Sequence, residues 1–343
     1  MKAVVIHAAH DLRIEDREPQ ALGEGQLRVA IEAGGICGSD LHYYHDGGFG
    51  AIRLREPMIL GHEIAGRIVE GTAEGLAVGD RVAVSPSRPC FDCTYCQQNM
   101  HNHCLNMRFY GSAMPMPHIQ GAFREELNVD AAQCFAVGQN VSAGEAAMAE
   151  PLAVVQHALV RAGALDGRRI LVTGCGPIGA LCVLSARAAG AAEVVVTDIL
   201  DPVLALARQI GADRAVNVAA EPDWTRKYSA NKGHFDVMFE ASGNQAALRS
   251  GLDVLRPRAT LVQLGLGGDI SIPQNLIVSK EIDIKGAFRF HEEFGTSVDL
   301  INSGTLDLAP LITDSFPVDQ AVSAFDLASD RSGAMKVQLQ FSN

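Results

Sequence analysis

Residues 168–179 read RRILVTGCGPIG, an apolar run that leads directly into a glycine-rich turn. The run ILVT is typical of a buried strand, and the turn has the spacing G-x-G-x-x-G. Glycine at these places permits a tight turn, close approach of the backbone to a pyrophosphate, and close packing of the helix that follows. The free N–H groups at the start of that helix would then meet the phosphate charge. We therefore predict a dinucleotide site at Gly174, Gly176, Pro177, Ile178 and Gly179.

Asp198 supports this interpretation, because it stands 19 residues after Gly179, at the end of the apolar run VVVTD. A carboxylate at this place accepts hydrogen bonds from the adenine ribose hydroxyls. A 2′-phosphate would face an unpaired carboxylate, and Ile199 and Leu200 supply no cation to bind it. The sequence therefore favours NAD over NADP, while Arg208 on the next helix leaves NADP possible.

The sequence on either side of this turn predicts an α/β fold with two domains. From Glu150 onward, apolar strands alternate with helical segments, which is typical of a doubly wound parallel sheet, here a Rossmann domain over residues 148–285. Residues 1–147 carry short strands separated by glycines, a pattern typical of an antiparallel, barrel-like domain. The segment 286–343 returns to mixed, amphipathic sequence, and we expect it to complete the first domain.

Four cysteines form the pattern C-x2-C-x2-C-x7-C, at Cys90, Cys93, Cys96 and Cys104. Four thiolates on one short loop can complete the tetrahedral shell of a zinc ion. Because a complete shell leaves no position for a substrate, we expect this zinc to be structural. Two disulfides are the alternative, but disulfide scaffolds are usually short secreted chains, and residues 1–16 do not resemble a secretory signal.

Two other fragments predict a reactive metal site. CGSDLH at 37–42 supplies a thiol, a hydroxyl and an imidazole, and GHEIAG at 61–66 supplies an imidazole beside a carboxylate. Cys37, His62 and one carboxylate can hold zinc while leaving a position open, and such a zinc acts as a Lewis acid toward an alcohol. Ser39 and His42 would relay the released proton.

Glu150 precedes the first helix of the Rossmann domain, and the sequence leaves two interpretations of it open. A glutamate at a helix start stabilises the helix dipole. At a domain boundary, the same carboxylate would face the cleft in which ligands commonly bind.

Composition limits the partners of this chain. The net charge of −12 argues against nucleic acid, because the phosphates would be repelled. No apolar run approaches the roughly 20 residues that a membrane-spanning helix needs, so we expect no membrane partner. Reduced cysteines favour the cytoplasm. An anionic substrate would need an arginine or lysine placed locally.

Taken together, the motifs resemble those of the zinc-dependent medium-chain dehydrogenase/reductase family, and within it the polyol dehydrogenase branch. The resemblance extends over essentially the whole chain. It implies a GroES-like catalytic domain, a Rossmann coenzyme domain, two zinc ions per chain and a homodimer or homotetramer. It places the catalytic zinc on Cys37 and His62, and leaves Glu63 and Glu150 as alternatives for the third ligand. The matching segments are CGSDLH, GHEIAG, the four cysteines, GCGPIG with Asp198, and KGAFRF at 285–290.

The resemblance also implies substrate contacts at Tyr43 and Arg289, although Tyr43 would serve equally as a packing residue. Arg108 is the more discriminating position, because sorbitol dehydrogenases carry an apolar residue there and an arginine can bind a carboxylate bidentately. We therefore expect a sugar acid as substrate. The alternatives are a polyol of the sorbitol or xylitol type, in which case Arg108 is a structural ion-pair partner, L-threonine, or a non-catalytic nucleotide-binding protein.

Overall fold

The computed structural model describes residues 1–341. Contacts between residues divide this part of the chain into two compact units. The first unit consists of Met1–Glu150, Phe290–Asp330 and residues 336–341, and the second consists of Pro151–Arg289 and Arg331–Met335. The chain thus leaves the first unit at Glu150 and returns to it twice.

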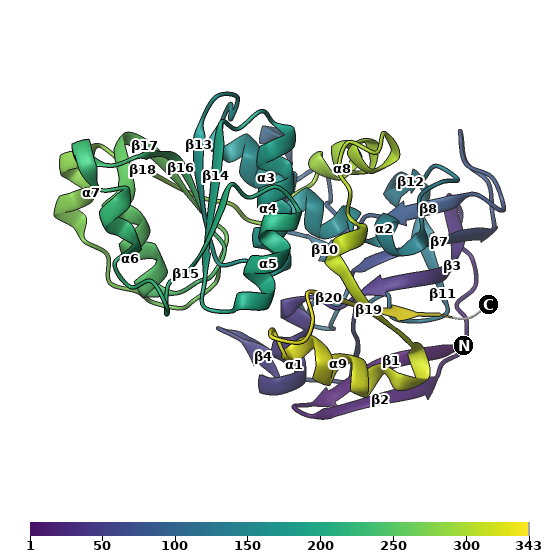
Figure 1. The fold of residues 1–343 in the computed structure, drawn as a ribbon. Helices are drawn as coiled ribbons and strands as arrows, with labels where there is room; N and C mark the ends of the chain where they lie inside the picture. The colour runs from purple at the N-terminus through teal and green to yellow at the C-terminus, as the bar shows by residue number, and fades with distance from the viewer. Residues whose placement is uncertain (342–343) are drawn as a thin grey trace. The chain divides into compact units, whose positions relative to one another are not determined.

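The second unit contains a six-stranded parallel sheet with the order β15-β14-β13-β16-β17-β18. Counted along the chain this is 3-2-1-4-5-6, the order of the doubly wound dinucleotide-binding fold, so the Rossmann prediction is confirmed. Helices α4 and α5 lie on one face and α6 on the other (Figure 1). The strands are β13 (Arg169–Thr173), β14 (Glu193–Asp198), β15 (Arg214–Asn217), β16 (Phe235–Glu240), β17 (Leu255–Gln263) and β18 (Asp283–Gly286). The helices are α3 (Ala149–Ala162), α4 (Pro177–Ala188), α5 (Asp201–Gln209), α6 (Gln245–Val254) and α7 (Gln274–Lys280).

Buried β-branched and aromatic side chains explain why these strands form. Every residue of β16 is buried, as are the central valines of β14, because helices cover both faces of the sheet. Strand β17 pairs with β16 on one side and with β18 on the other. It is therefore an interior strand, and the free edge of the sheet belongs to β18.

Helix α5 begins at Asp201, so Asp201 is its first residue and not its N-cap. Leu200 occupies the N-cap, and Asp201 lies in the first turn, where its carboxylate accepts a hydrogen bond of 2.7 Å from the Asn217 side chain. Pro202 remains in the first turn, where its missing N–H has no helical partner to lose.

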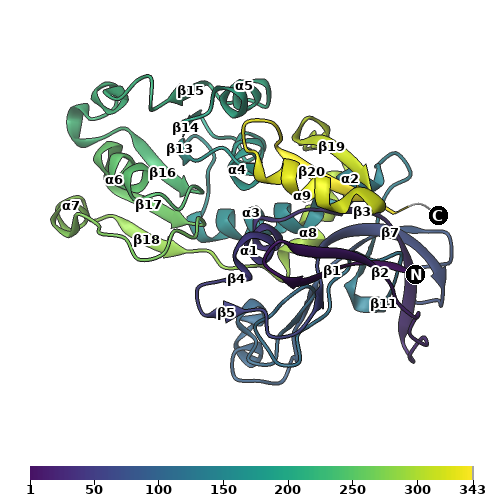
Figure 2. The same cartoon turned by 90° about the horizontal axis from the view of Figure 1, so that it is seen from below.

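The first unit is built mainly from antiparallel strands, as predicted. A seven-stranded sheet has the order β12-β8-β7-β3-β20-β19 with β11 also paired to β3, and a smaller sheet has the order β2-β1-β6. Strand β20 lies antiparallel to β3, so residues near the end of the chain complete a sheet that the first hundred residues begin (Figure 2). The strands are β1 (Lys2–Ala8), β2 (Asp11–Asp16), β3 (Gln26–Gly35), β4 (Gly48–Phe49), β5 (Ile52–Arg53), β6 (Met58–Ile59), β7 (Glu63–Glu70), β8 (Arg81–Val84), β9 (Ser87–Arg88), β10 (Arg108–Phe109), β11 (Glu126–Asp130), β12 (Cys134–Ala136), β19 (Ile312–Pro317) and β20 (Lys336–Gln340). The helices are α1 (Gly38–Asp46), α2 (Ala143–Ala147), α8 (Glu293–Asn302) and α9 (Ala321–Ser329).

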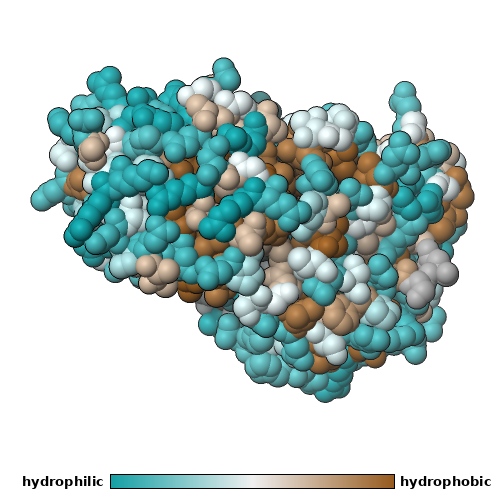
Figure 3. Space-filling model, viewed as in Figure 1, coloured by the Kyte–Doolittle hydropathy of each residue, from teal (hydrophilic) through white to brown (hydrophobic). Residues whose placement is uncertain are grey.

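Apolar side chains are concentrated inside each unit rather than on its surface. Phe123, Ile31 and Ile64 are fully buried in the first unit, and Phe235, Phe239 and Leu171 in the second. On the visible face of the second unit, hydrophilic side chains predominate (Figure 3). Among residues 1–341 no helix has the length and apolar character needed to cross a membrane.

Candidate active site and metal centres

Cys37, His62 and Glu63 come together at one end of the main sheet of the first unit. Cys37 is the N-cap residue of α1, His62 immediately precedes β7, and Glu63 is its first residue. One ligand atom from each residue lies within 4.8 Å of the others. The two predicted fragments therefore form one cluster with the donor set of a zinc site: a thiol, an imidazole and a carboxylate.

Asp40, which the sequence analysis did not single out, fixes both fragments in place. Its Oδ2 accepts a hydrogen bond of 3.0 Å from the Cys37 N–H, and its Oδ1 accepts one of 3.2 Å from the Gly61 N–H. This carboxylate is fully buried, so these bonds are formed away from water. Its position within CGSDLH was the only signal in the sequence.

The His62 ring has the surroundings of a metal ligand. Its Nδ1 is buried and has no hydrogen-bond partner among the described residues, and it faces Asp40 Oδ1 at 3.8 Å. A carboxylate on this side favours the tautomer that is protonated at Nδ1, which leaves Nε2 with a lone pair for a metal. The His62 ring can therefore offer Nε2 to an ion beside the Cys37 thiol and the Glu63 carboxylate.

Glu63 forms a buried ion pair with Lys336 on β20. The Lys336 ammonium donates hydrogen bonds of 2.9 and 2.8 Å to the two carboxylate oxygens, and a third of 3.1 Å to the Ile36 carbonyl. Both side chains are only 2% exposed. Lys336 is separated from Glu63 by 273 residues, so no local sequence pattern could have identified it.

The electrostatics of the cluster fit a bound cation. Burial, followed by the Glu63 carboxylate, raises the pKa of the Cys37 thiol to about 12. Burial likewise raises the pKa of Glu150 to about 8, and Glu63 and Cys37 add to that shift while His62 opposes it. Cys37 and Glu150 therefore resist ionisation, although the nearby Lys336 ammonium favours it, and further positive charge would favour it more. A divalent ion would supply it, so the residues fit zinc.

Glu150 lies near this cluster but outside its ligand set. The side chain is buried, and its charge acts on His62, Glu63 and Cys37. Its oxygens are not part of the group whose ligand atoms lie within 4.8 Å. Glu150 therefore faces the metal site rather than solvent, although it also stands in the first turn of α3.

The two predicted relay residues differ in position. The Ser39 hydroxyl hydrogen-bonds to the Cys37 thiol and lowers its pKa against the effect of burial. His42 is half-exposed one turn further along α1, where its Nδ1 faces Asp46 at 3.6 Å. Ser39 thus lies at the cluster, whereas His42 lies on the solvent-exposed side of α1.

The second centre is the lobe formed by residues 87–109, which contains the four cysteines. The Sγ atoms of Cys90, Cys93, Cys96 and Cys104 lie within 4.8 Å of one another. All eight cysteines are free, so the disulfide alternative is not supported. Backbone N–H groups point at the sulfurs, as from Cys90 to Cys104 at 3.2 Å and from Leu105 to Cys93 at 3.4 Å.

These thiols are set up for a cation as well. Hydrogen bonds to its sulfur lower the pKa of Cys90 to about 6, and the bond from the Asp92 backbone has the greatest effect. Burial instead raises the pKa of Cys96 to about 12. Four thiolates at this separation repel one another and need a positive ion to share them. The donor set fits a closed, structural zinc.

The dinucleotide turn has the geometry that its glycines predict. Gly174 has a φ of +82° and lies against Ser242, and a Cβ on Gly179 would collide with the Gly174 carbonyl at 1.9 Å. A Cβ on Gly176, however, would meet nothing within 4 Å. Packing inside the protein therefore does not require glycine at 176, and this position at the N-terminus of α4 is open, as the close approach of a pyrophosphate would need.

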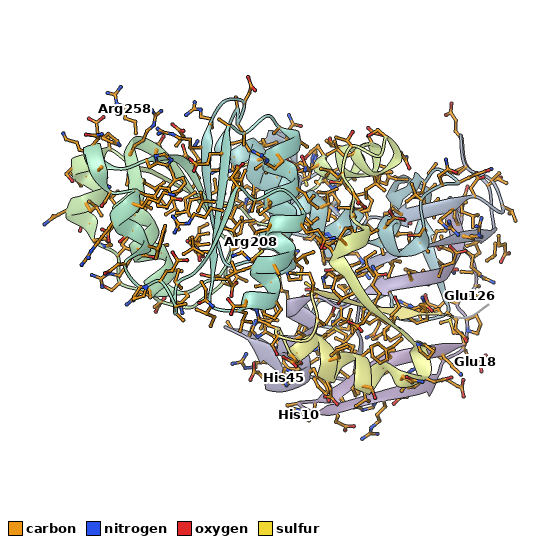
Figure 4. The ribbon with its side chains drawn as sticks, in the orientation of Figure 1. His10, Glu18, His45, Glu126, Arg208 and Arg258 are labelled. Atoms are coloured by element: carbon orange, nitrogen blue, oxygen red, sulfur yellow. The ribbon has the colours of Figure 1, made fainter. Side chains whose placement is uncertain are left out.

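Asp198 lies at the end of β14 and is already hydrogen-bonded. Its Oδ2 accepts a hydrogen bond of 2.7 Å from the Cys175 N–H and one of 3.1 Å from the Arg331 guanidinium. Its Oδ1 accepts hydrogen bonds from the backbone N–H groups of the two residues that follow it. The carboxylate is therefore not unpaired, contrary to the sequence interpretation. The guanidinium of Arg208, labelled in Figure 4, donates one hydrogen bond of 2.8 Å to the Ala215 carbonyl.

Comparison with known proteins agrees with this arrangement. Residues 23–139 match the family model of the alcohol dehydrogenase GroES-like domain, and residues 177–303 match that of the zinc-binding dehydrogenases. An L-idonate 5-dehydrogenase (NAD(P)(+)) of Escherichia coli K12 is 41% identical, with 91% of each chain covered. A sorbitol dehydrogenase of Bacillus subtilis is 34% identical over 96% of this chain and 93% of that enzyme. The crystal structure of the Escherichia coli L-idonate 5-dehydrogenase superposes with a TM-score of 0.94 at 38% identity, covering 99% and 98% of the two chains.

The chain belongs to the zinc-binding dehydrogenase family. The resemblance found in the sequence and the GroES-like and Rossmann fold class are confirmed. This zinc-binding dehydrogenase is an oxidoreductase, and its cofactors are zinc and NAD(P).

The structure places the predicted substrate residues of this dehydrogenase in different surroundings. Tyr43 is buried, and its hydroxyl accepts a hydrogen bond of 3.0 Å from the Ala113 N–H. Arg289 has a φ of +54°, and its guanidinium lies over the Phe288 ring at 5.1 Å. Within residues 1–341 the Arg108 guanidinium is exposed and has no hydrogen bond or ion pair, so no structural ion-pair partner is seen.

The two residues of strand β10 face opposite sides, and Phe109 is the one that packs against the metal cluster. Phe109 is buried with its ring 5.6 Å from that of His62. Neighbouring side chains of a strand point to opposite faces, so the Arg108 side chain leaves the strand on the other side from Phe109. Opposite Arg108 on β9 stands Arg88, which is paired with Asp130 at 2.5 Å.

Proposed function

We propose that this zinc-binding dehydrogenase oxidises a secondary alcohol of a sugar acid with NAD(P), converting L-idonate to 5-ketogluconate. The observation that carries the proposal is the 41% identity to the Escherichia coli L-idonate 5-dehydrogenase over 91% of both chains. Arg108, whose guanidinium has no ion-pair partner among the described residues, is a local cation on a chain of net charge −12, and this supports an anionic substrate. A polyol is the second candidate, because sorbitol dehydrogenases are also related, at 34% identity and less.

Cys37, His62 and Glu63 would hold the catalytic zinc. We assign the third position to Glu63 because its oxygen belongs to the ligand cluster, whereas the oxygens of Glu150 do not. When bound, zinc supplies Lewis-acid chemistry at the alcohol oxygen, and NAD(P) supplies the hydride acceptor. Lys336 orients Glu63, and Asp40 orients Cys37 and His62. Measuring the zinc content of the Glu63→Gln and Glu150→Gln proteins tests the assignment. We expect Glu63→Gln to lose one zinc per chain, and a loss in Glu150→Gln alone would contradict the assignment.

Ser39 and His42 would carry the released proton outward. Ser39 already hydrogen-bonds to the Cys37 thiol, and His42 reaches solvent from the same helix. A hydroxyl that both donates and accepts can pass a proton without holding a charge, and a half-exposed imidazole can release it to water. Helix α1 would thus carry both residues of the proton path from the cluster to the surface.

Arg331 would broaden coenzyme use. The pyrophosphate would meet the turn at Gly176, and the ribose hydroxyls would donate to Asp198. Because Arg331 lies 3.1 Å from that carboxylate and is half-exposed, a 2′-phosphate would find a cation beside the acidic group. We expect Arg331→Ala to raise KM for NADP about tenfold while changing KM for NAD by less than twofold. Equal changes for both coenzymes would contradict this role.

A substrate panel tests the sugar-acid proposal. Arg108→Leu should lower kcat/KM for L-idonate by one to two orders of magnitude, because a charge-assisted contact is lost, and should leave any sorbitol activity unchanged. Arg88→Leu, the residue opposite on β9, is the matched control. Good turnover of sorbitol without idonate turnover, or unaltered idonate kinetics in Arg108→Leu, would favour the polyol candidate.

Location and assembly complete the proposal. Eight free cysteines support a reducing compartment such as the cytoplasm. The uncovered edge of β18, with Ile284 45% exposed, supports a homodimer or homotetramer that pairs there. Light scattering of the protein and of an Ile284→Pro variant tests the assembly, since an unchanged mass in the variant would place the interface elsewhere.

A further inference from the structure

A third cluster of potential metal ligands lies on the lobe, apart from the four cysteines. It consists of His101, His291 and Glu292, and one ligand atom from each lies within 4.8 Å of the others. His101 belongs to a short 3-10 turn of the lobe, and the other two residues immediately precede α8. All three belong to the first unit, and neither of the sites described above uses any of them.

The two imidazoles are held in position by aromatic packing. Their ring centroids are 4.9 Å apart, and the Phe91 ring contacts both, at 5.1 Å from His101 and 5.6 Å from His291. Phe91 itself is held with a φ of +56°, which is an unusual backbone conformation for a residue with a side chain. Imidazoles arranged in this way lose little additional freedom when an ion binds.

Hydrogen bonds prepare each ligand for a cation. The Ser87 hydroxyl lies 3.4 Å from His291 Nδ1, which leaves the other ring nitrogen for a ligand. The His101 Nδ1 lies 2.5 Å from the Glu292 carboxylate, so a negative charge is present at the cluster. The carboxylate of Glu292 is thus bonded to one of the two imidazoles, and its charge also lies close to the other.

We propose that His101, His291 and Glu292 form a third zinc site. Two neutral imidazoles and one carboxylate are a known ligand set for Zn²⁺, with water in the fourth position. The ion would join the lobe to the start of α8, two segments that are about 190 residues apart in sequence. It would thereby hold the four-cysteine lobe against the segment that follows Arg289. The proposal does not depend on which substrate the enzyme uses.

Zinc titration of the intact protein tests this site. Protein purified with its resident zinc is dialysed against metal-free buffer without chelator, titrated with ZnCl₂ at pH 7.5, and analysed for bound zinc per chain. The wild type should bind one equivalent more than the His101→Gln and Glu292→Gln proteins. The His103→Gln protein, altered in the same short turn, should match the wild type. An equal zinc content in all four proteins would overturn the proposal, because any additional zinc would then be adventitious.

Cobalt provides a second measurement that does not depend on stability. With Co²⁺ added to the zinc-containing protein, a nitrogen and oxygen site should give weak visible bands and no thiolate charge-transfer band near the ultraviolet. These bands should be absent from Glu292→Gln, whose substituted side chain is exposed and should not affect folding. Thiolate charge-transfer absorption, or bands that persist in Glu292→Gln, would place the added ion elsewhere.

Discussion

The four-cysteine lobe and the Cys37–His62–Glu63 cluster are built in opposite ways. The lobe takes all its ligands from residues 90–104 and supports them with backbone N–H groups of the same loop. The cluster takes its ligands from two fragments and its supporting charges from Asp40, Glu150 and Lys336. The lobe is locally complete, whereas the cluster depends on the whole first unit. This difference indicates which centre can be open and reactive, since an incomplete set of ligands needs a surrounding structure to hold it.

The largest expected effect separates the two centres by mutation. His62→Ala should reduce kcat by about 10³-fold, because the Lewis acid is lost, while the lobe keeps its zinc. Cys96→Ser should instead lower the unfolding midpoint and release the lobe zinc. Zinc analysis, thermal unfolding and initial rates measure all three quantities. If the two variants lost zinc, stability and activity to the same extent, the centres would not be independent.

Lys336→Met should have the next largest effect, because it leaves the Glu63 carboxylate buried without its counter-charge. Removing one partner of a buried pair costs about 3–5 kcal/mol, so urea unfolding of protein lacking the catalytic zinc should show a loss of that size. Added zinc should restore part of it by supplying positive charge.

Lys280→Met is the matched control for this prediction. Lys280 is also buried, but its ammonium donates to the carbonyls of Leu252, Asp253 and Leu255 rather than to a carboxylate. Added zinc should not restore the stability that Lys280→Met loses. Equal recovery of both variants with zinc would mean that the metal stabilises the protein generally and not through Glu63.

Chelation should produce a smaller, kinetic difference between the centres. The open site has three protein ligands and the lobe has four, so a chelator at pH 7.5 should remove activity about tenfold faster than it removes the lobe zinc. Zinc release, followed with a chromogenic chelator in the His101→Gln background that lacks the proposed third site, should show two phases. The fast phase should be missing from Cys37→Ser, and its persistence there would assign it to a different site.

The smallest effect on activity is expected from a change in the proposed proton relay of Ser39 and His42. His42→Ala should lower kcat by less than about tenfold, because water can replace a half-exposed imidazole. The loss should be partly restored by added imidazole in the assay. His103→Ala, on the lobe, should have no effect on kcat, and a comparable loss there would remove the distinction between the two centres.

The parts predicted from the sequence are those whose determinants are local. The G-x-G-x-x-G turn, the four cysteines and the strands of the second unit each lie in one continuous stretch, and the structure contains them. Lys336 and Arg331 were missed because each acts on a residue more than a hundred positions away. The free edge at β18 was missed because apolar sequence does not reveal which strand of a buried sheet is last. Asp40 was overlooked although it stands within CGSDLH, since an acidic residue in a helix's first turn usually indicates only a cap.

The ion pair between Glu63 and Lys336 also imposes an order on biosynthesis. The ribosome produces Cys37, His62 and Glu63 early, but the ammonium that neutralises Glu63 is made 273 residues later. A nascent chain that has left the ribosome only as far as the Rossmann domain therefore has an acidic pocket without its basic partner. The first unit can reach its final packing only when β20 joins β3, so the metal pocket is completed only after the Rossmann domain has been made.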